Sequence, residues 1–116
     1  MKSDERLIRD AYDAFNRKDA DGALAALHPD VEWADGEGGF VHGRSEVRDH
    51  WQQQWKASNP TIEPLRFSRG ASEEQVTVEI RLMVRDKGNN IMSDQTMQNI
   101  FVLERGLIKR MHIKES

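Results

Sequence analysis

Two side chains that can move a proton near neutral pH stand close to aromatic residues in the sequence. Asp35 follows Trp33 by two positions, within the segment HPDVEWADGEGGFVHG that covers residues 28–43. His50 directly precedes Trp51. A carboxyl group that is partly removed from water, or an imidazole with a pKa of about 6.5, can act as a general base or acid. Asp35 and His50 are therefore the candidate catalytic residues.

Each of these candidates also has a structural interpretation. If the strand that contains Trp33 continues, Asp35 shares its face and lies at the mouth of a pocket, where partial burial raises the pKa of a carboxyl group. If the chain turns at Gly36, the Asp35 carboxylate binds backbone amides instead, a frequent role of aspartate in turns.

His50 is either a proton carrier or a residue at the edge of a buried helix face. Adjacent Asp49 cannot orient it, because residues i and i+1 of a helix do not face each other. Of these interpretations, the turn is favoured for Asp35 and the edge of the buried helix face for His50.

Three tryptophans supply the aromatic surface that a flat apolar ligand needs. Trp51 and Trp55 are four residues apart and share one face of a helix, whereas Trp33 comes from the preceding strand. The same spacing is typical of a helix packed into a core. No histidine pair has the i, i+4 spacing of a helical zinc site, there is no cysteine, and the glycines after Asp35 lack the lysine of a phosphate-binding loop. We therefore expect neither a metal nor an organic cofactor.

The spacing of the apolar residues predicts helices first and strands afterwards. Periods of three to four residues predict helices over residues 4–17 and 20–28, and a third after the candidate cap Ser45 that ends before Asn59. A first strand from Val31 lies between the second and third helices. Alternation with period two and turn residues predict four more strands, over residues 60–70, 74–86, 91–104 and 107–114. The first of these four belongs at a sheet edge, because Pro64 cannot donate a hydrogen bond.

This order of elements is an α+β plan, with the whole chain of residues 1–116 as one domain. The 17 basic and 20 acidic side chains leave a net charge of -3, which gives no general attraction for nucleic acid or acidic membranes. The first residues, MKSDERLIRDA, lack the apolar stretch of a secretory signal, and no run approaches the ~18 apolar residues of a membrane span. We expect a soluble, cytoplasmic protein that binds neither nucleic acid nor membranes.

Several separated landmarks together resemble the SnoaL-like branch of the nuclear transport factor 2-like superfamily. They are the segments FNRKD, LHPDVEW, VHGRSEVRDHW and FVLERGLIKRMHI, in that order. The resemblance implies an α+β cone, in which three N-terminal helices pack on a curved, mostly antiparallel sheet around a deep pocket. It also implies a homodimer that pairs through the outer face of the sheet. Members similar in fold include ketosteroid isomerases, polyketide cyclases, scytalone dehydratase, limonene epoxide hydrolases and domains without catalytic role, so the fold does not name the reaction.

The catalytic residues of the ketosteroid isomerases are a tyrosine on the first helix, an aspartate base on the first strand and a protonated acid in the sheet. Matched through the landmarks, these positions fall on Ala11 (with Tyr12 next to it), Trp33 and Gln98. All three depart from the isomerase pattern, so isomerisation by that machinery is not expected. The alternation of residues 96–103 leaves both sides of this strand apolar, and the resemblance alone directs Gln98 inward. An amide there can donate to and accept from a ligand oxygen but cannot be a base.

Two hypotheses of different classes follow. The first is a small-molecule pocket protein that performs acid-base chemistry, such as isomerisation, cyclisation, dehydration or hydrolysis, on a small apolar substrate. Asp35 or His50 would be the catalytic residue, and the ligand-binding residues would be Tyr12, Trp33, Trp51, Trp55, Gln98 and Met111. The second is a non-catalytic ligand-binding or dimerisation domain whose cavity is filled by its own tryptophans and Met111. Whether the cavity is open or filled discriminates between them.

Overall fold

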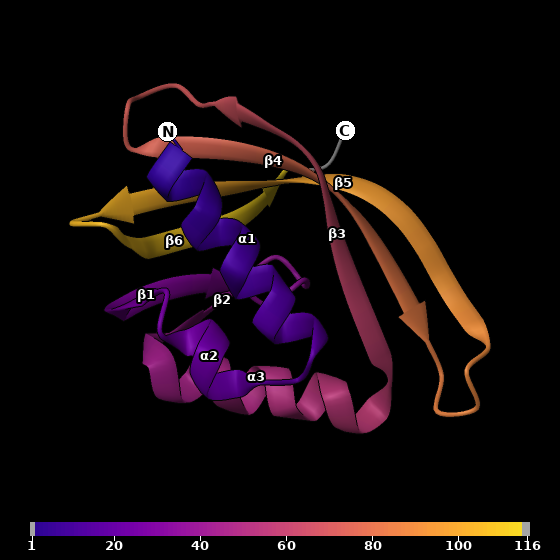
Figure 1. The fold of residues 1–116 in the computed structure, drawn as a ribbon. Helices are drawn as coiled ribbons and strands as arrows, with labels where there is room; N and C mark the ends of the chain where they lie inside the picture. The colour runs from indigo at the N-terminus through magenta and orange to yellow at the C-terminus, as the bar shows by residue number, and fades with distance from the viewer. Residues whose placement is uncertain (1, 115–116) are drawn as a thin grey trace.

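The computed structural model describes residues 2–114 and confirms the α+β architecture. The helices are α1 (Lys2–Asn16), α2 (Ala20–Leu24) and α3 (Gly43–Ala57). The strands are β1 (Leu27–Ala34), β2 (Phe40–His42), β3 (Asn59–Arg69), β4 (Gln75–Arg85), β5 (Ile91–Glu104) and β6 (Leu107–Lys114). The sheet is strongly bent, with α1 lying across it and α3 along its lower side, while the β4–β5 hairpin reaches past the end of α3 (Figure 1).

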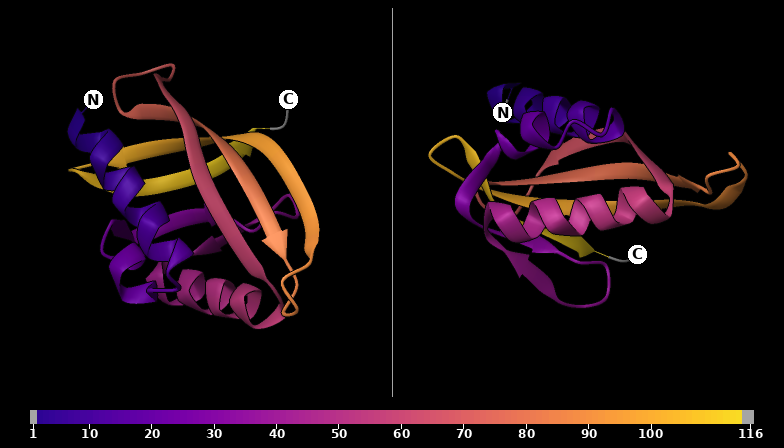
Figure 2. Two further views of the ribbon diagram at one scale, coloured as in Figure 1. Left: turned by 45° about the vertical axis from the view of Figure 1, so that its right-hand side comes forward. Right: turned by 90° about the horizontal axis from the view of Figure 1, so that it is seen from below.

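The six strands lie in the order β2-β1-β6-β5-β4-β3. Every neighbouring pair is antiparallel except β1 and β6, which run parallel and are separated in the chain by α3 and four strands. The strand that contains Pro64 is β3, and it stands at the edge of the sheet as predicted. Figure 2 shows that the helices gather on one side of the sheet and leave its other face uncovered.

The core lies between the helices and the concave face of the sheet. On β4 the alternation predicted from the sequence holds, since Val76, Val78 and Ile80 are fully buried. From α1 and α3, Ile8 and Val47 reach the same core and are likewise fully buried. No helix among residues 2–114 is long and apolar enough to cross a membrane.

The first half of the chain differs from the sequence prediction in three places. Residues 40–42 form β2, a strand that the sequence analysis missed, because two glycines with positive φ, Gly36 and Gly38, turn the chain back onto β1. Helix α2 ends at Leu24 rather than at residue 28, since Leu27 pairs with Ile108 of β6. Helix α3 begins before Ser45, and its first residues follow His42, whose backbone N–H donates to Glu46.

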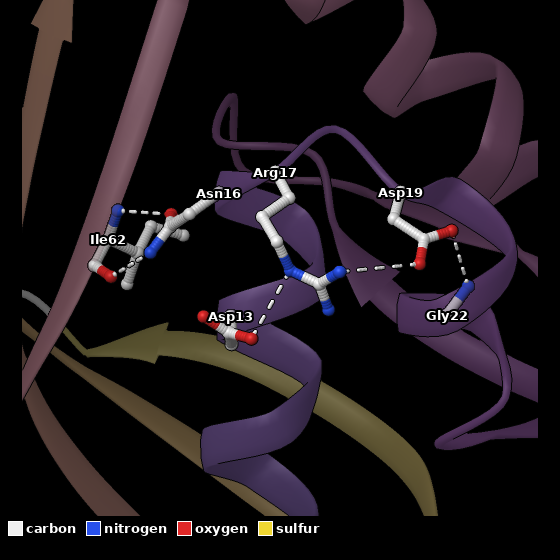
Figure 3. Close-up of polar contacts among 6 residues, drawn as sticks. All are labelled: Asp13, Asn16, Arg17, Asp19, Gly22 and Ile62. Atoms are coloured by element: carbon white, nitrogen blue, oxygen red, sulfur yellow. Dashed lines mark hydrogen bonds and ion pairs between the residues drawn. The ribbon is translucent and has the colours of Figure 1, made fainter.

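One side chain fastens the end of α1 to the edge of the sheet. The Asn16 amide donates to the carbonyl oxygen of Ile62 and accepts from its N–H, both at 2.8 Å, as a neighbouring strand would (Figure 3). These backbone groups of β3 point away from β4 and are part-buried. Asn16 therefore satisfies an edge that lacks a further strand. On the solvent side of α1, Arg17 lies between Asp13 and Asp19, and Asp19 accepts from Gly22 to cap α2.

We predict that Asn16→Ala lowers the free energy of unfolding by about 1–3 kcal/mol, because it leaves the N–H and C=O of Ile62 without partners. The matched control is Asp13→Asn, which removes an exposed ion pair with Arg17 and should change stability by less than about 0.5 kcal/mol. Urea denaturation monitored by tryptophan fluorescence measures both. Equal effects of the two substitutions would contradict the role given to Asn16.

Candidate functional site

A cavity of about 620 Å³ opens between the helices and the concave face of the sheet. Its walls are mostly apolar, and they come from α1, α3 and five of the strands. The apolar lining includes Phe15, Trp33, Trp51, Ile62, Ile80, Leu82, Met97, Met111 and Ile113. The polar lining consists of Tyr12, Asp35, His50, Gln54, Ser58, Gln95, Thr96 and Asn99. A hollow lined by apolar side chains with polar groups among them is typical of a small-molecule site.

The deep end of the cavity is formed by Tyr12 of α1 and Asn99 of β5. Both side chains are buried, and the Asn99 amide nitrogen donates to the Tyr12 hydroxyl at 2.9 Å. The Tyr12 ring packs edge to face against Phe101, with ring centroids 5.9 Å apart. Burial raises the pKa of the Tyr12 phenol well above its ordinary value, because a phenolate there would lose its hydration, and the bond from Asn99 offsets this only in part. Tyr12 is therefore a neutral hydrogen-bonding group near neutral pH.

This pair has hydrogen-bonding capacity that the described residues do not use. The oxygen of the Asn99 amide is buried and has no partner among them. In the orientation with the amide nitrogen toward Tyr12, the Tyr12 O–H remains free to donate; with the amide reversed, both N–H hydrogens of Asn99 remain. Either way, donor hydrogens remain at the deep end, and a buried polar group without a partner is unfavourable. An acceptor oxygen placed there would satisfy these donor hydrogens, whereas the Asn99 oxygen, with the amide nitrogen toward Tyr12, needs a donor.

At the mouth of the cavity, Asp35 follows the end of β1 and its carboxylate is tied to the turn. Its Oδ1 accepts from the backbone N–H of Glu37 at 2.7 Å and of Gly39 at 3.1 Å. These two bonds, with a smaller contribution from the nearby imidazole of His50, lower the pKa of Asp35. The turn interpretation of Asp35 thus holds, although the residue also lines the cavity.

The alternative, in which burial at the mouth raises the pKa of Asp35, is therefore contradicted, and the favoured turn interpretation stands. Backbone amides stabilise the ionised carboxylate more than partial burial disfavours it. A carboxylate with a lowered pKa is a weak base, so Asp35 is poorly suited to take a proton from a substrate. His50 lies beside it on α3, half-buried and also lining the cavity, with its Nε2 3.3 Å from the side-chain nitrogen of Gln54.

Two of the three tryptophans line the cavity, and the third lies in the core. Trp33 and Trp51 pack edge to face with centroids 5.4 Å apart, and both line the cavity, as does Met111. Trp55 does not line it: its ring packs against Phe15 at 5.4 Å and is almost fully buried. The expectation that Trp55 forms part of the ligand wall is corrected to a core position, because its ring packs against Phe15 of α1 and against Trp51.

The comparisons with known proteins agree with this geometry. The family model described as the SnoaL-like domain matches residues 8–111. The chain belongs to this family. Its fold is nuclear transport factor 2-like, as the resemblance implied. No curated protein matches the sequence.

Solved structures similar to this SnoaL-like domain cover nearly its whole length. A nuclear transport factor 2-like protein of unknown function from Burkholderia pseudomallei is 24% identical with a TM-score of 0.83, over 100% of this chain and 92% of the other. Rv0760c from Mycobacterium tuberculosis, in complex with estradiol-17beta-hemisuccinate, is 16% identical with a TM-score of 0.84, over 98% and 94%. The Delta 5-3-ketosteroid isomerase from Mycobacterium sp. is 11% identical with a TM-score of 0.83, over 98% and 93%. At these identities the likeness shows the fold.

At two of the positions matched to the isomerases, the neighbouring residue faces the core instead of the matched one. Gln98 faces the outer side of the sheet, and its neighbour Asn99 points inward, because β5 buries the same side from Asn99 through Phe101 to Leu103. On α1, Ala11 is only half-buried whereas Tyr12 lies in the core. In this SnoaL-like domain the inward pair is thus Tyr12 and Asn99.

The sequence contains one signal for the inward orientation of Asn99. Phe101 and Leu103, the bulkiest residues of the strand's second half, share its side, and bulky apolar residues on a half-buried strand favour the core face. Phe101 and Leu103 are both buried in the core of the SnoaL-like domain. Among residues 2–114 no group of three acidic, histidine or cysteine side chains is placed to hold a metal ion.

We predict a loss of stability at alkaline pH that originates from Tyr12, the one tyrosine of the chain. Below about pH 10 the phenol keeps its proton in both states; above it the unfolded chain releases the proton while the folded protein retains it, so stability falls by about 1.4 kcal/mol per pH unit. Urea denaturation at several alkaline pH values should show this slope relative to Tyr12→Phe, in which the other titrating groups are unchanged. Phenolate absorbance that rises before unfolding would contradict the assignment.

Proposed function

We propose that this protein binds a small, flat, largely apolar molecule that carries an acceptor oxygen, such as a ketone, lactone or epoxide. The oxygen lies at the deep end, where Tyr12 or Asn99 donates to it, and the apolar body lies between Trp33, Trp51 and Met111. The observation that carries the proposal is the Tyr12–Asn99 pair, which is buried, lines the cavity and has unused hydrogen-bonding capacity: an amide oxygen without a partner, and donor hydrogens beyond the one that joins the pair. Such a pair is costly in an apolar cavity unless a partner satisfies it.

The size of the cavity supports a ligand rather than a self-filled core. A volume of about 620 Å³ falls within the range of about 300–1,000 Å³ that is usual for small-molecule sites. A non-catalytic domain that fills its own cavity would have Trp33, Trp51 and Met111 closing the space, whereas here they line it. Rv0760c, which shares the fold, was solved with a steroid derivative, and this likeness agrees with a flat apolar ligand.

A second candidate function is acid-base turnover of the same ligand. Donors aimed at an oxygen also stabilise negative charge that develops on it during proton abstraction. His50 is the favoured base, because it lines the cavity and because the pKa of Asp35 is lowered. Replacement of His50 by Gln that abolishes turnover without weakening ligand binding would support this function over binding alone.

The proposed binding is tested with two probes of the same shape, acetylnaphthalene and ethylnaphthalene, by calorimetry. The ketone should bind on the order of 5-fold more tightly than the hydrocarbon, since one added hydrogen bond contributes about 1 kcal/mol. Tyr12→Phe and Asn99→Leu should each reduce this ratio. Ile91→Ala, on the exposed hairpin outside the cavity, is the control and should leave it unchanged. Absence of binding by both probes would refute the proposal.

We also propose that the protein forms a homodimer through the outer face of the sheet. There, Ile100 of β5 pairs with His112 of β6, and both are half-buried. The Nδ1 atom of His112 is buried without a hydrogen-bond partner among the described residues. Burial and the nearby charge of Arg110 lower the pKa of His112, which favours its uncharged form on this face of the sheet. A second copy would cover this region.

Sedimentation velocity tests the dimer. The wild-type protein should sediment at the mass of two chains, and Ile100→Glu should sediment as one, because a carboxylate would be desolvated at the centre of the interface. Thr61→Glu, on the exposed edge strand, is a control that should remain dimeric. A wild-type protein at the mass of one chain would rule out this assembly.

A further inference from the structure

The fixed charge that lines the cavity is negative. Among residues 3–114, whose side chains the structure describes, no lysine or arginine lines the cavity, although the chain has 17 of them. The acidic residue that lines it is Asp35, and the other residue there that can carry charge near neutral pH is His50. A ligand with a carboxylate would therefore meet one fixed negative charge and no fixed positive charge.

One of the two oxygens of the Asp35 carboxylate, Oδ2, accepts no hydrogen bond from the described residues. Both bonds from the turn, from the N–H of Glu37 and of Gly39, go to Oδ1. Oδ2 takes part in none of the hydrogen bonds or ion pairs found among the described side chains. It lies against Gly39, where a Cβ would come within 3.0 Å of it, so the absence of a side chain at this position leaves room for it. The turn thus holds an ionised carboxylate at the mouth with one oxygen unengaged.

An indole and an imidazole line the cavity together with Asp35. Trp33, two residues before Asp35, is half-buried and lines the same cavity. An indole attracts a cation that approaches its face. The imidazole of His50 is near enough to influence Asp35 electrostatically, and in its neutral form it can accept a further N–H. A carboxylate, an indole and an imidazole form a set of groups that suits an ammonium ion.

We propose that the ligand carries a protonated amine at the end opposite its acceptor oxygen, and that the amine binds Asp35 beside Trp33 at the mouth of the cavity. The inference deepens the proposed function and rests on it, because the oxygen at Tyr12 and Asn99 sets the direction in which the ligand lies. The ligand class is then an apolar, flat amino ketone or a similar amine. Hydroxyl groups in place of the amine are tolerated, since they also donate to Oδ2, and carboxylates are disfavoured by repulsion.

The test uses three probes with one body, an acetylnaphthalene that carries an aminomethyl, a hydroxymethyl or a carboxylate group at the far ring position. Calorimetry near neutral pH with the whole chain gives the three Kd values. The amine should bind about 3- to 5-fold more tightly than the alcohol, and on the order of 10-fold more tightly than the carboxylate, as expected for a charge pair open to solvent. The preference should shrink as salt is added, because salt screens exposed charges.

Asp35→Asn is the decisive variant, because the amide oxygen can still accept from the N–H groups of Glu37 and Gly39 while the charge is removed. The ratio of the alcohol and amine Kd values should fall to about one. Glu37→Gln removes a charge from the same loop, outside the cavity lining, and should keep the wild-type ratio. If Asp35→Asn does not fold, the ranking of the three probes on the wild-type protein decides the matter by itself.

The outcomes separate this inference from the function on which it rests. Binding of the alcohol and the unsubstituted ketone without preference for the amine would overturn the inference and leave the proposed function standing. A wild-type preference for the carboxylate, or an amine preference that persists in Asp35→Asn, would overturn it as well. Failure of every probe, the unsubstituted ketone included, would overturn both.

Discussion

The hydrogen bond between Asn99 and Tyr12 is the interaction from which the rest of the site takes its arrangement. It joins β5 to the C-terminal half of α1 at 2.9 Å, and Asn99 is the buried polar residue among the described core positions. Because β5 keeps Asn99, Phe101 and Leu103 on one side, the same strand that supplies the polar group also supplies the ring that packs on Tyr12. The bond therefore fixes both the distance between helix and sheet and the polar end of the cavity.

The two ends of the cavity differ in how they hold charge. At the deep end, burial keeps the Tyr12 phenol neutral, so that it offers a hydrogen and not a charge. At the mouth, backbone amides of the glycine-rich turn keep Asp35 ionised. Under the proposed function, a neutral donor inside and an anion at the mouth would orient an elongated ligand, with the stronger electrostatic interaction where desolvation is least.

The bend of the sheet explains why space remains between the layers. The long hairpin of β4 and β5 curves away from α1 and passes α3, whereas the edge strand β3 is held to α1 by Asn16 (Figure 1). The tryptophans of α3 fill one side of the gap. Trp55 packs in the core against Phe15, whereas Trp51 packs against Trp33 and lines the cavity. The cavity is therefore what the bulky residues of α3 leave open beneath the curved strands.

The sequence by itself determined the α+β class, the edge position of β3, the core side of β4 and the family, because apolar spacing and proline chemistry act locally and several landmarks recur in order. It also identified Asp35, Tyr12 and Trp33 as candidate residues of the site. It did not determine the side on which Gln98 and Asn99 face, because both sides of β5 are apolar and only contact with Tyr12 and Phe101 distinguishes them. Nor did it determine the state of Asp35, whose pKa depends on amides that the Gly36–Gly39 turn brings to its oxygen. Tertiary structure decided these points, since burial and hydrogen-bond partners come from residues distant in the chain or from the path of a turn, and neither is encoded in residue type alone.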